Sequence, residues 1–262
     1  MGNGNGWLVH FHPDEHRFAE KVNDWVERAA NQHAVKRTDF LDPRQAFIVQ
    51  SLANRNGRVN VCFYGGYEDA ERTRAVLAPD YRQPEAEEAG IGLLSVVSDD
   101  ARFSELDHGD FLGALLGVGI KRDKIGDIHV GEGYCHCLVA EEILDYIRLN
   151  LHQVHRVRVM TETLPLSELR TAAKPLDELM LTVASLRLDG IVSDVFRLSR
   201  AKVLQPIKAG RCKVNWAPED DPSRPLKEGD VVSFQGFGRF KLLAVEGETK
   251  KGRIRLKIGK FV

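Results

Sequence analysis

The sequence lacks the features that mark membrane-spanning and secreted proteins. No apolar run in its 262 residues approaches the length of a transmembrane helix, and the start, MGNGNGWLVHFHPDEH, has neither the basic nor the apolar region of a signal peptide. The composition is otherwise ordinary for a soluble chain that is long enough to bury a core in two or three domains. We therefore expect a cytoplasmic protein, or a stromal one in a photosynthetic lineage.

Cysteine is scarce and irregularly spaced. Because Cys62, Cys135, Cys137 and Cys212 are scattered through strand-like stretches, they form no disulfide framework and we expect reduced thiols. The CHC stretch around His136 raises the alternative of a zinc site, but no second ligand pair is visible. Residues 135 and 137 would lie on one face of a strand, where small thiols pack well. We expect no metal and no cofactor.

Charge is balanced overall but not along the chain. The sequence has 37 Lys and Arg residues against 38 Asp and Glu, for a formal net charge of −1. Residues 181–262 carry 17 basic and 9 acidic side chains, a net charge of +8, whereas residues 1–180 have a net charge of −9. A basic module on an acidic body attracts polyanions at one end only, which favours nucleic acid as the partner.

The N-terminal third of the chain predicts two helices and a strand. Residues 13–32 have an apolar stripe at helical spacing, and a second helix is expected from Asp42 to Gly57. A strand is expected over residues 58–66. The following DAERTRAVLAPD, residues 69–80, is interpreted as a short helix.

A second domain follows the acidic stretch 83–90, which is interpreted as a linker. The patterns beyond it predict the order βαββαβ, the ferredoxin-like plan that RNA-recognition domains share. The basic, glycine and aromatic pattern with which such sheets stack bases is absent from LLSVVS (93–98) and YCHCLVA (134–140). We therefore expect this domain to be a scaffold or a protein-docking surface. Lys121, Arg122 and Lys124 suit either a helix C-terminus or a phosphate, and both interpretations stay open.

The basic stretch 185–216 is too regular for a loop. Apolar residues at helical spacing predict a buried helix face made of Leu181, Ala184, Leu188, Ile191 and Val195. Ser199 can cap a second helix, and Gly210 is a natural end for it. Strands are expected over 211–216 and after 225.

This order of residues resembles the S-four RNA-binding domain, also called the Alpha-L motif. The match rests on Arg187-Leu188-Asp189, Ser199-Arg200, Gly210, Val214-Asn215 and Gly229-Asp230. In that family, two short helices and the following strand turn present basic side chains to structured RNA. Two departures are a proline, Pro206, which should kink or shorten the second helix, and Trp216 at a position that is often glycine, where we expect it to pack.

Lys and Arg attract phosphates, and Ser and Asn can donate to sugar or phosphate oxygens. In KKGRIRLKIGKF, basic and apolar residues alternate, so one strand face is expected to be a second cationic edge. The expected RNA contacts are Arg187, Arg197, Ser199, Arg200, Lys202, Lys208, Arg211, Lys213, Asn215, Arg253, Arg255 and Lys257.

Longer stretches together resemble the YlmH family of bacterial proteins, including its cyanobacterial and plastid branch. They are TDFLDPRQ (38–45), FYGGYEDAERTRAVLAPDY (63–81), HGDFLGALLGVGIKRDKIGDI (108–128), TVASLRLDGIVSDVFRLSRAKV (182–203), CKVNW (212–216) and TKKGRIRL (249–256). The resemblance implies a non-catalytic protein associated with the large ribosomal subunit, acting on stalled complexes that retain peptidyl-tRNA. It also implies an association with photosystem II in the photosynthetic branch.

We thus expect an α+β protein with an N-terminal αβ domain (1–85), a central ferredoxin-like, RNA-recognition-like domain (86–165) and a C-terminal S-four-type domain (166–262). The leading hypothesis is an RNA-binding protein, not an enzyme, that binds rRNA or tRNA on the large ribosomal subunit in translation or ribosome-associated quality control. One alternative is an RNA-modifying or hydrolytic enzyme with a site around His108, Asp110 and Lys121, although Asp107 and Asp110 should cap a helix. Another is a photosystem II assembly factor.

Overall fold

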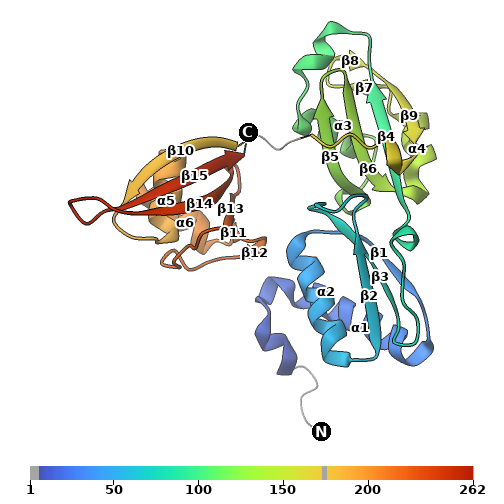
Figure 1. Ribbon diagram of the computed structural model, residues 1–262, viewed down its shortest axis with the longest axis horizontal. Coiled ribbons are helices and arrows are strands. Elements are labelled where there is room, and N and C mark those ends of the chain that lie inside the picture. Colours follow the sequence, from blue (N-terminus) through green and yellow to red (C-terminus); the bar gives the residue numbers. More distant parts are fainter. Residues whose placement is uncertain (1–5, 173–175, 262) are drawn as a thin grey trace. The chain divides into compact units, whose positions relative to one another are not determined.

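The computed structural model describes residues 6–172 and 176–261, and backbone contacts divide them into two units (Figure 1). We call residues 15–172 the body, while the C-terminal unit contains residues 176–261 together with residues 6–14. The outermost residues of the predicted ranges 1–85 and 166–262 lie outside the described residues, and the division into three domains stays a prediction. Within the described residues, no helix is both long and apolar enough to span a bilayer.

The first part of the body is an αβ layer. Two helices, α1 (His16–Gln32) and α2 (Pro43–Asn56), pack on an antiparallel sheet with the order β1 (Lys36–Leu41), β3 (Thr73–Pro79), β2 (Val59–Tyr64). The two predicted helices and the strand over 58–66 are confirmed. Asp42 caps α2 because its carboxylate accepts a hydrogen bond from the backbone N–H of Gln45. Short 3-10 turns, η1 (Gly6–His10) and η2 (Pro13–Glu15), precede α1.

The helix predicted over residues 69–80 is wrong, because Thr73–Pro79 is strand β3. This strand pairs with β1 on one side and β2 on the other, and residues 75–78 are buried. A strand buried on both faces has no polar alternation, so a short apolar run cannot be told from a helix by its period. Strand β1 was also not predicted from its sequence, KRTDFL.

The second part of the body confirms the predicted βαββαβ order. Its elements are β4 (Ile91–Val97), η4 (Ala101–Glu105), α3 (His108–Gly117), η5 (Arg122–Lys124), β5 (Ile125–Gly131), β6 (Tyr134–Ala140), η6 (Glu141–Ile143), α4 (Leu144–Asn150), β7 (Gln153–Val154), β8 (Val157–Arg158), β9 (Met160–Leu164) and η7 (Leu166–Glu168). The central sheet has the order β5-β6-β4-β9, with all neighbours antiparallel. That order is the one expected of a ferredoxin-like domain.

One face of the central sheet is covered by α3 and α4. Phe111, Leu115 and Ile147 from these helices pack in one cluster with Cys135 and Cys137 from β6. The Sγ atoms of the two cysteines are 3.6 Å apart, and burial raises the pKa of the Cys135 thiol. Among the described residues, no group of three or more His, Cys, Asp or Glu side chains could hold a metal ion.

Residues 83–90 are not a free linker. They contain η3 (Ala86–Ala89), and Ala89 is buried in an apolar cluster that joins Phe40 and Val76 of the first sheet to Leu93 and Leu138 of the central sheet. Because this apolar cluster contains residues of both sheets, the first and second parts of the body form one unit.

An ion pair between a buried arginine and a more exposed glutamate reinforces this joint. The guanidinium of Arg74, with a side chain only 3% exposed, donates to both carboxylate oxygens of Glu142 at 3.0 Å. Lys124 donates to the same carboxylate at 2.9 Å. Burial acts against ionisation, but these hydrogen bonds outweigh it and lower the pKa of Glu142 to about 2.

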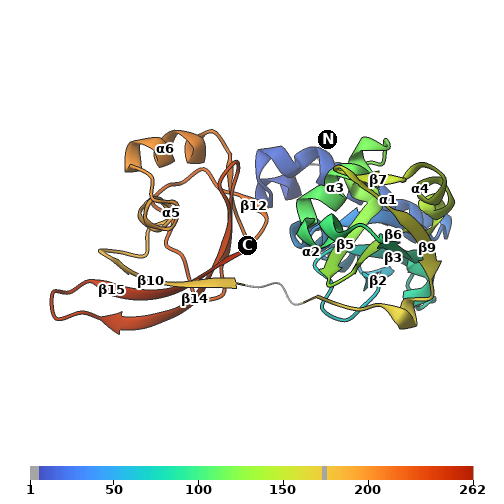
Figure 2. The ribbon, with the colours of Figure 1, turned by 90° about the horizontal axis from the view of Figure 1, so that it is seen from above.

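The C-terminal unit is a six-stranded sheet with two helices on one side (Figure 2). Its elements are β10 (Leu176–Val183), α5 (Leu188–Phe196), α6 (Arg200–Lys208), β11 (Cys212–Val214), β12 (Ala217–Pro218), β13 (Val231–Phe234), β14 (Gly238–Glu248) and β15 (Ile254–Phe261). The strand order is β10-β15-β14-β13-β11-β12. Val192 of α5 and Val203 of α6 pack with Phe240 and Ile258 on the inner face of the sheet.

The expectation of a helix face beginning at Leu181 is corrected. Leu181 lies in β10, opposite Leu256 of β15, and helix α5 begins only at Leu188. Leu179, Leu181 and Val183 point inward at the period of two that is typical of a strand. The spacing between Leu181 and the apolar residues of α5 matches a helical period only by chance.

Candidate nucleic-acid interface

The first basic group lies where α5 begins. Arg187 occupies the N-cap position, and its Nε and Nη2 atoms each donate to the carboxylate of Asp189 at 3.0 Å. The Asp189 side chain is only 6% exposed, whereas that of Arg187 is 44% exposed. The carboxylate also accepts the backbone N–H of Gly190. The ion pair therefore fixes the orientation of a guanidinium that still faces solvent.

Arg200 joins the same group from the start of α6. A Cβ atom added at Gly190 would lie 3.3 Å from Nη2 of Arg200, so this guanidinium lies across the first turn of α5. Burial raises the pKa of Asp189, but the hydrogen bonds to it and the charges of Arg187 and Arg200 together lower it. Two guanidinium groups thus accompany one buried carboxylate, to which Arg187 is hydrogen-bonded, and the group has a net positive charge.

The exposed side of α6 extends this group. Ser199 is the N-cap residue, but its hydroxyl makes no capping hydrogen bond. Lys202 and Lys208 are exposed, while the opposite side of the helix buries Val203 and Ile207. Pro206 lies inside the helix as predicted, and α6 ends two residues later. Arg197, an exposed residue, ends α5 in the left-handed conformation with a φ of 53°.

A second basic group lies on the sheet. Arg211, Lys213 and Arg239 line one cavity of about 450 Å³ together with Ser233 and Gln235. Lys213 pairs with Ser233, which pairs with Arg239, so the three side chains share the outer face of the sheet. Sequence analysis missed Arg239, although the alternation of basic and apolar residues in RFKL, residues 239–242, carried the signal.

Trp216 packs within the protein, as expected, and its ring lies against the guanidinium of Arg239. The guanidinium carbon of Arg239 lies 5.3 Å from the centre of the Trp216 ring and 4.7 Å from that of Phe261. Trp216 has a φ of 64°, which explains why glycine is common at this position. The two rings hold Arg239 at the edge of the cavity.

Asn215 serves the turn that follows β11. Its side-chain nitrogen donates to Asp230 at 2.8 Å, and its side-chain oxygen accepts the backbone N–H of Val231 at 2.9 Å. These hydrogen bonds therefore join the end of β11, the strand that carries Lys213, to the start of β13. A contact of Asn215 with RNA stays a prediction.

The expected alternation in the last strand is confirmed. Leu256 and Ile258 are buried, whereas Arg255 is exposed on the outer face of the sheet, opposite Thr182. Lys257 lies on the same face and pairs with Glu178 at 2.8 Å. Just before this strand, Arg253 donates to the backbone carbonyl of Thr182.

The predicted residues therefore do not form one continuous cluster. The structure brings Arg187 and Arg200 together on the side of the unit that α5 and α6 cover. The same two helices and their ends carry Arg197, Ser199, Lys202 and Lys208. The structure also brings Arg211 and Lys213 together at the cavity, and Arg255 and Lys257 together on the outer face of the sheet. Because α5 and α6 cover the inner face, the outer-face residues form a separate surface.

One residue of the enzyme alternative, Asp110, has a structural role. Asp107 and Asp110 cap α3 reciprocally, each carboxylate accepting the backbone N–H of the other at 3.0 and 3.1 Å, as expected. Arg122 and Lys124 form η5 instead of a helix C-terminus. Arg122 donates to the carbonyl of Ile125 at 2.6 Å.

Comparisons with known proteins agree with this architecture. A family model described as "YlmH, N-terminal" matches residues 14–82, and one described as "Putative RNA-binding domain in YlmH" matches residues 84–168. The second description differs from our expectation of a scaffold, since it attaches RNA binding to the central domain.

Two individual proteins are similar over most of their own length. A Bacillus subtilis (strain 168) protein, "Ribosome-associated protein quality control protein P2", is 38% identical over 247 residues, which cover 94% of this chain and 95% of that protein. A solved structure, "Cell division protein ylmH from Streptococcus pneumoniae", shares 26% sequence identity with a TM-score of 0.54, covering 61% of this chain and 96% of that one.

Proposed function

Because this chain belongs to the YlmH family, we propose that it is an RNA-binding protein that associates with the ribosome and acts in ribosome-associated quality control. The name of the similar B. subtilis protein states ribosome association and quality control. The family description of residues 84–168 states RNA binding. Both agree with the basic groups of the C-terminal unit.

The observation that carries the proposal is the group formed by Arg187, Asp189 and Arg200. A buried carboxylate holds one guanidinium in a fixed, solvent-facing position and attracts the second. Such preorganised Arg side chains can donate two hydrogen bonds to one phosphate, and they lose little side-chain entropy on binding. Lys202 and Lys208 add positive charges on the same helical side. This surface suits the phosphate backbone of folded RNA.

We propose the large ribosomal subunit as the partner, with rRNA or tRNA as the RNA. Phosphate contacts determine position and orientation but not sequence. The protein would therefore recognise the shape of a ribosomal complex and act by occupying a site, without catalysing a reaction. The cytoplasm, where ribosomes work, is the proposed location, and the stromal location and the photosystem association stay predictions.

Co-sedimentation with purified large subunits tests this proposal. The double variant Arg200→Ala/Lys202→Ala removes two phosphate-binding charges without uncovering a buried carboxylate, since Arg187 still pairs with Asp189. We expect its binding to fall by at least tenfold. The matched control, Arg17→Ala/Arg28→Ala, removes two exposed charges from helix α1, outside residues 84–168, and should bind like the wild type. Equal binding by both double variants would contradict the proposal.

A further inference from the structure

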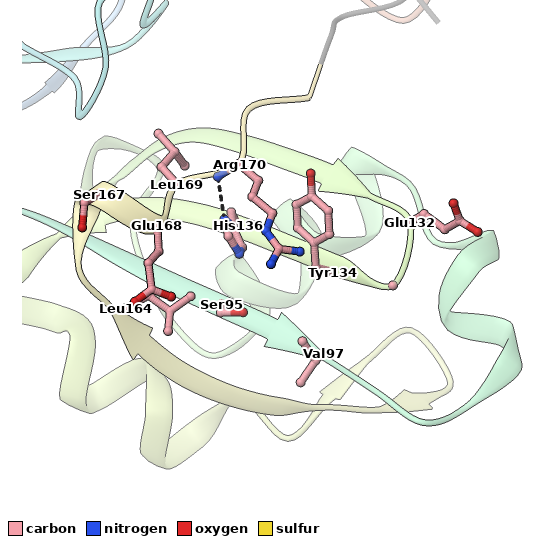
Figure 3. A pocket seen from close by; sticks show the side chains of 11 residues that line it. Ser95, Val97, Glu132, Tyr134, His136, Leu164, Ser167, Glu168, Leu169 and Arg170 are labelled. Atoms are coloured by element: carbon pink, nitrogen blue, oxygen red, sulfur yellow. Dashed lines mark hydrogen bonds between the residues drawn. The ribbon is translucent and has the colours of Figure 1, made fainter.

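The outer face of the central sheet holds a cavity that the C-terminal basic groups do not explain. It has a volume of about 500 Å³ and lies over β4 and β6, on the face opposite α3 and α4 (Figure 3). The residues that line it include Ser95, Tyr134, His136, Leu164, Glu168 and Arg170. This volume lies in the usual range of small-molecule sites.

His136 provides a hydrogen-bond donor on the floor of the cavity. The residue is only 3% exposed, and its Nδ1 accepts the backbone N–H of Arg170 at 3.1 Å. Burial, and then the charge of Arg170, lower the pKa of His136, so the ring is neutral at pH 7. In a neutral ring whose Nδ1 is an acceptor, Nε2 carries the proton. Nε2–H is therefore the donor left for a ligand.

Glu168 provides an acceptor in the same cavity. It ends η7, the short turn after β9, and its carboxylate lies on the opposite side of His136 from Tyr134 (Figure 3). Glu168 and His136 line the same cavity, and the negative charge of Glu168 raises the pKa of His136, against the larger effects of burial and Arg170. Ser95 of β4 lies directly opposite His136 in the sheet and adds a hydroxyl to the floor.

Planar groups form one wall of the cavity. The rings of Tyr134 and His136 have centres 4.8 Å apart, and the guanidinium carbon of Arg170 lies 5.3 Å from the centre of the Tyr134 ring. Aromatic and guanidinium planes are the groups on which proteins stack unpaired RNA bases. Leu164 gives the cavity an apolar side on β9.

We propose that this cavity binds a guanine base that is unstacked from a single-stranded segment of RNA. Guanine presents the carbonyl O6 as an acceptor next to the donors N1–H and N2–H, so it can pair with the His136 donor and with both carboxylate oxygens of Glu168, which line the same cavity. Adenine can pair only N1 with His136 and N6–H with Glu168, and uracil only O4 with His136 and N3–H with Glu168, so each of these bases makes one hydrogen bond fewer than guanine. The inference rests on the proposed RNA-binding function and names the base that the central domain selects.

Fluorescence anisotropy of the full-length chain with labelled heptaribonucleotides tests the inference. The probes are UUUGUUU, the same strand with inosine or adenine in place of guanine, and free GMP as a competitor. Inosine lacks only the 2-amino group, so we expect it to bind severalfold more weakly, and adenine about tenfold more weakly, because a bidentate base contact discriminates by about that factor. Free GMP should compete poorly, because it lacks the neighbouring nucleotides.

Variants assign the preference to the cavity. Glu168→Gln should abolish the difference between guanine and inosine, whereas Glu105→Gln, an exposed matched change outside the cavity, should retain it. Tyr134→Leu should weaken the binding of all heptamers. Equal binding of guanine and adenine strands, a preference that survives Glu168→Gln, or GMP competing as well as UUUGUUU would overturn the inference.

The two proposals fail separately. A chain that binds large subunits but shows no guanine preference contradicts only this inference. A chain that prefers guanine in a Glu168-dependent manner but does not bind large subunits contradicts only the proposed ribosomal function.

Discussion

At the scale of single residues, carboxylates determine how two arginines of this protein are oriented. Asp189 is almost fully buried beneath Arg187, and Glu142 is partly buried against Arg74. In both pairs the arginine is held by two hydrogen bonds. The first pair leaves its guanidinium half exposed and available to RNA, whereas the second buries it and joins the two parts of the body.

Replacing Asp189 by Ala should lower the free energy of unfolding of the C-terminal unit by about 1–2 kcal/mol, because the buried N–H of Gly190 loses its acceptor while Arg187, which loses its partner, stays exposed to water. Urea denaturation followed by circular dichroism measures the change. Asp194→Ala, an exposed change on the same helix, is the control and should cost less than about 0.5 kcal/mol. Similar losses for the two variants would mean that the pair contributes nothing specific.

Stability of the body should depend on Glu142 in acid. Its pKa in the folded state is about 2, below the ordinary value of 4.5, so the folded state favours the ionised form. The stabilisation is complete above about pH 4.5 and is lost as the pH falls toward 2. Because the side chain is 37% exposed, we discount the shift for solvent screening and expect about 1–2 kcal/mol.

Thermal unfolding between pH 2 and 6 measures this contribution. The wild type should lose stability more steeply with falling pH than Glu142→Gln, and the two curves should converge at the acid end. Parallel curves over the whole range would show that the Glu142 carboxylate does not titrate as the structure requires.

At the scale of elements, helices with local end signals could be predicted from sequence, whereas strands placed by distant partners could not. Asp42 caps the start of α2 and Gly57 caps its end, and both ends could be predicted from these residue types. Strand β3 is central in its sheet only because β1 and β2 lie on either side, which no local pattern shows. The guanine cavity was missed for a related reason, since Ser95, Tyr134 and Glu168 meet from three elements.

The C-terminal basic stretch shows the same limit. The sequence correctly predicted that this stretch contains two helices and that the last strand alternates basic and apolar residues. It could not predict that the cations lie on two separate surfaces, because that separation follows from the order of the strands in the sheet. Lys213 lies on the outer face because β11 pairs with β13, and its neighbour Arg239 comes from a strand more than twenty residues later.

The turn after β11 gives a prediction at this scale. Asn215 has a φ of 51°, and its amide makes two hydrogen bonds within the protein. Asn215→Ala should destabilise the unit by about 2 kcal/mol, since it removes both bonds and places alanine in a strained backbone conformation. Asn215→Gly removes the same bonds without the strain and should cost less. Equal losses in urea denaturation would rule out a contribution from the backbone conformation.

At the scale of the whole molecule, the chain combines an acidic body with a basic C-terminal unit. The body carries a cavity of mixed polarity that suits a single base, and the C-terminal unit carries exposed cations, one of them fixed by an ion pair, that suit phosphates. We expect the charges to supply most of the affinity for RNA and the cavity to supply selectivity, because phosphate contacts are independent of sequence.

The salt dependence of binding to large ribosomal subunits tests the central claim most directly. If about six phosphates are contacted, the affinity should fall by about a thousandfold between 50 and 200 mM salt. The slope of log affinity against log salt should be smaller by about two for Arg200→Ala/Lys202→Ala, because two contacts are lost. Binding that does not respond to salt, or a double variant with the slope of the wild type, would contradict the account.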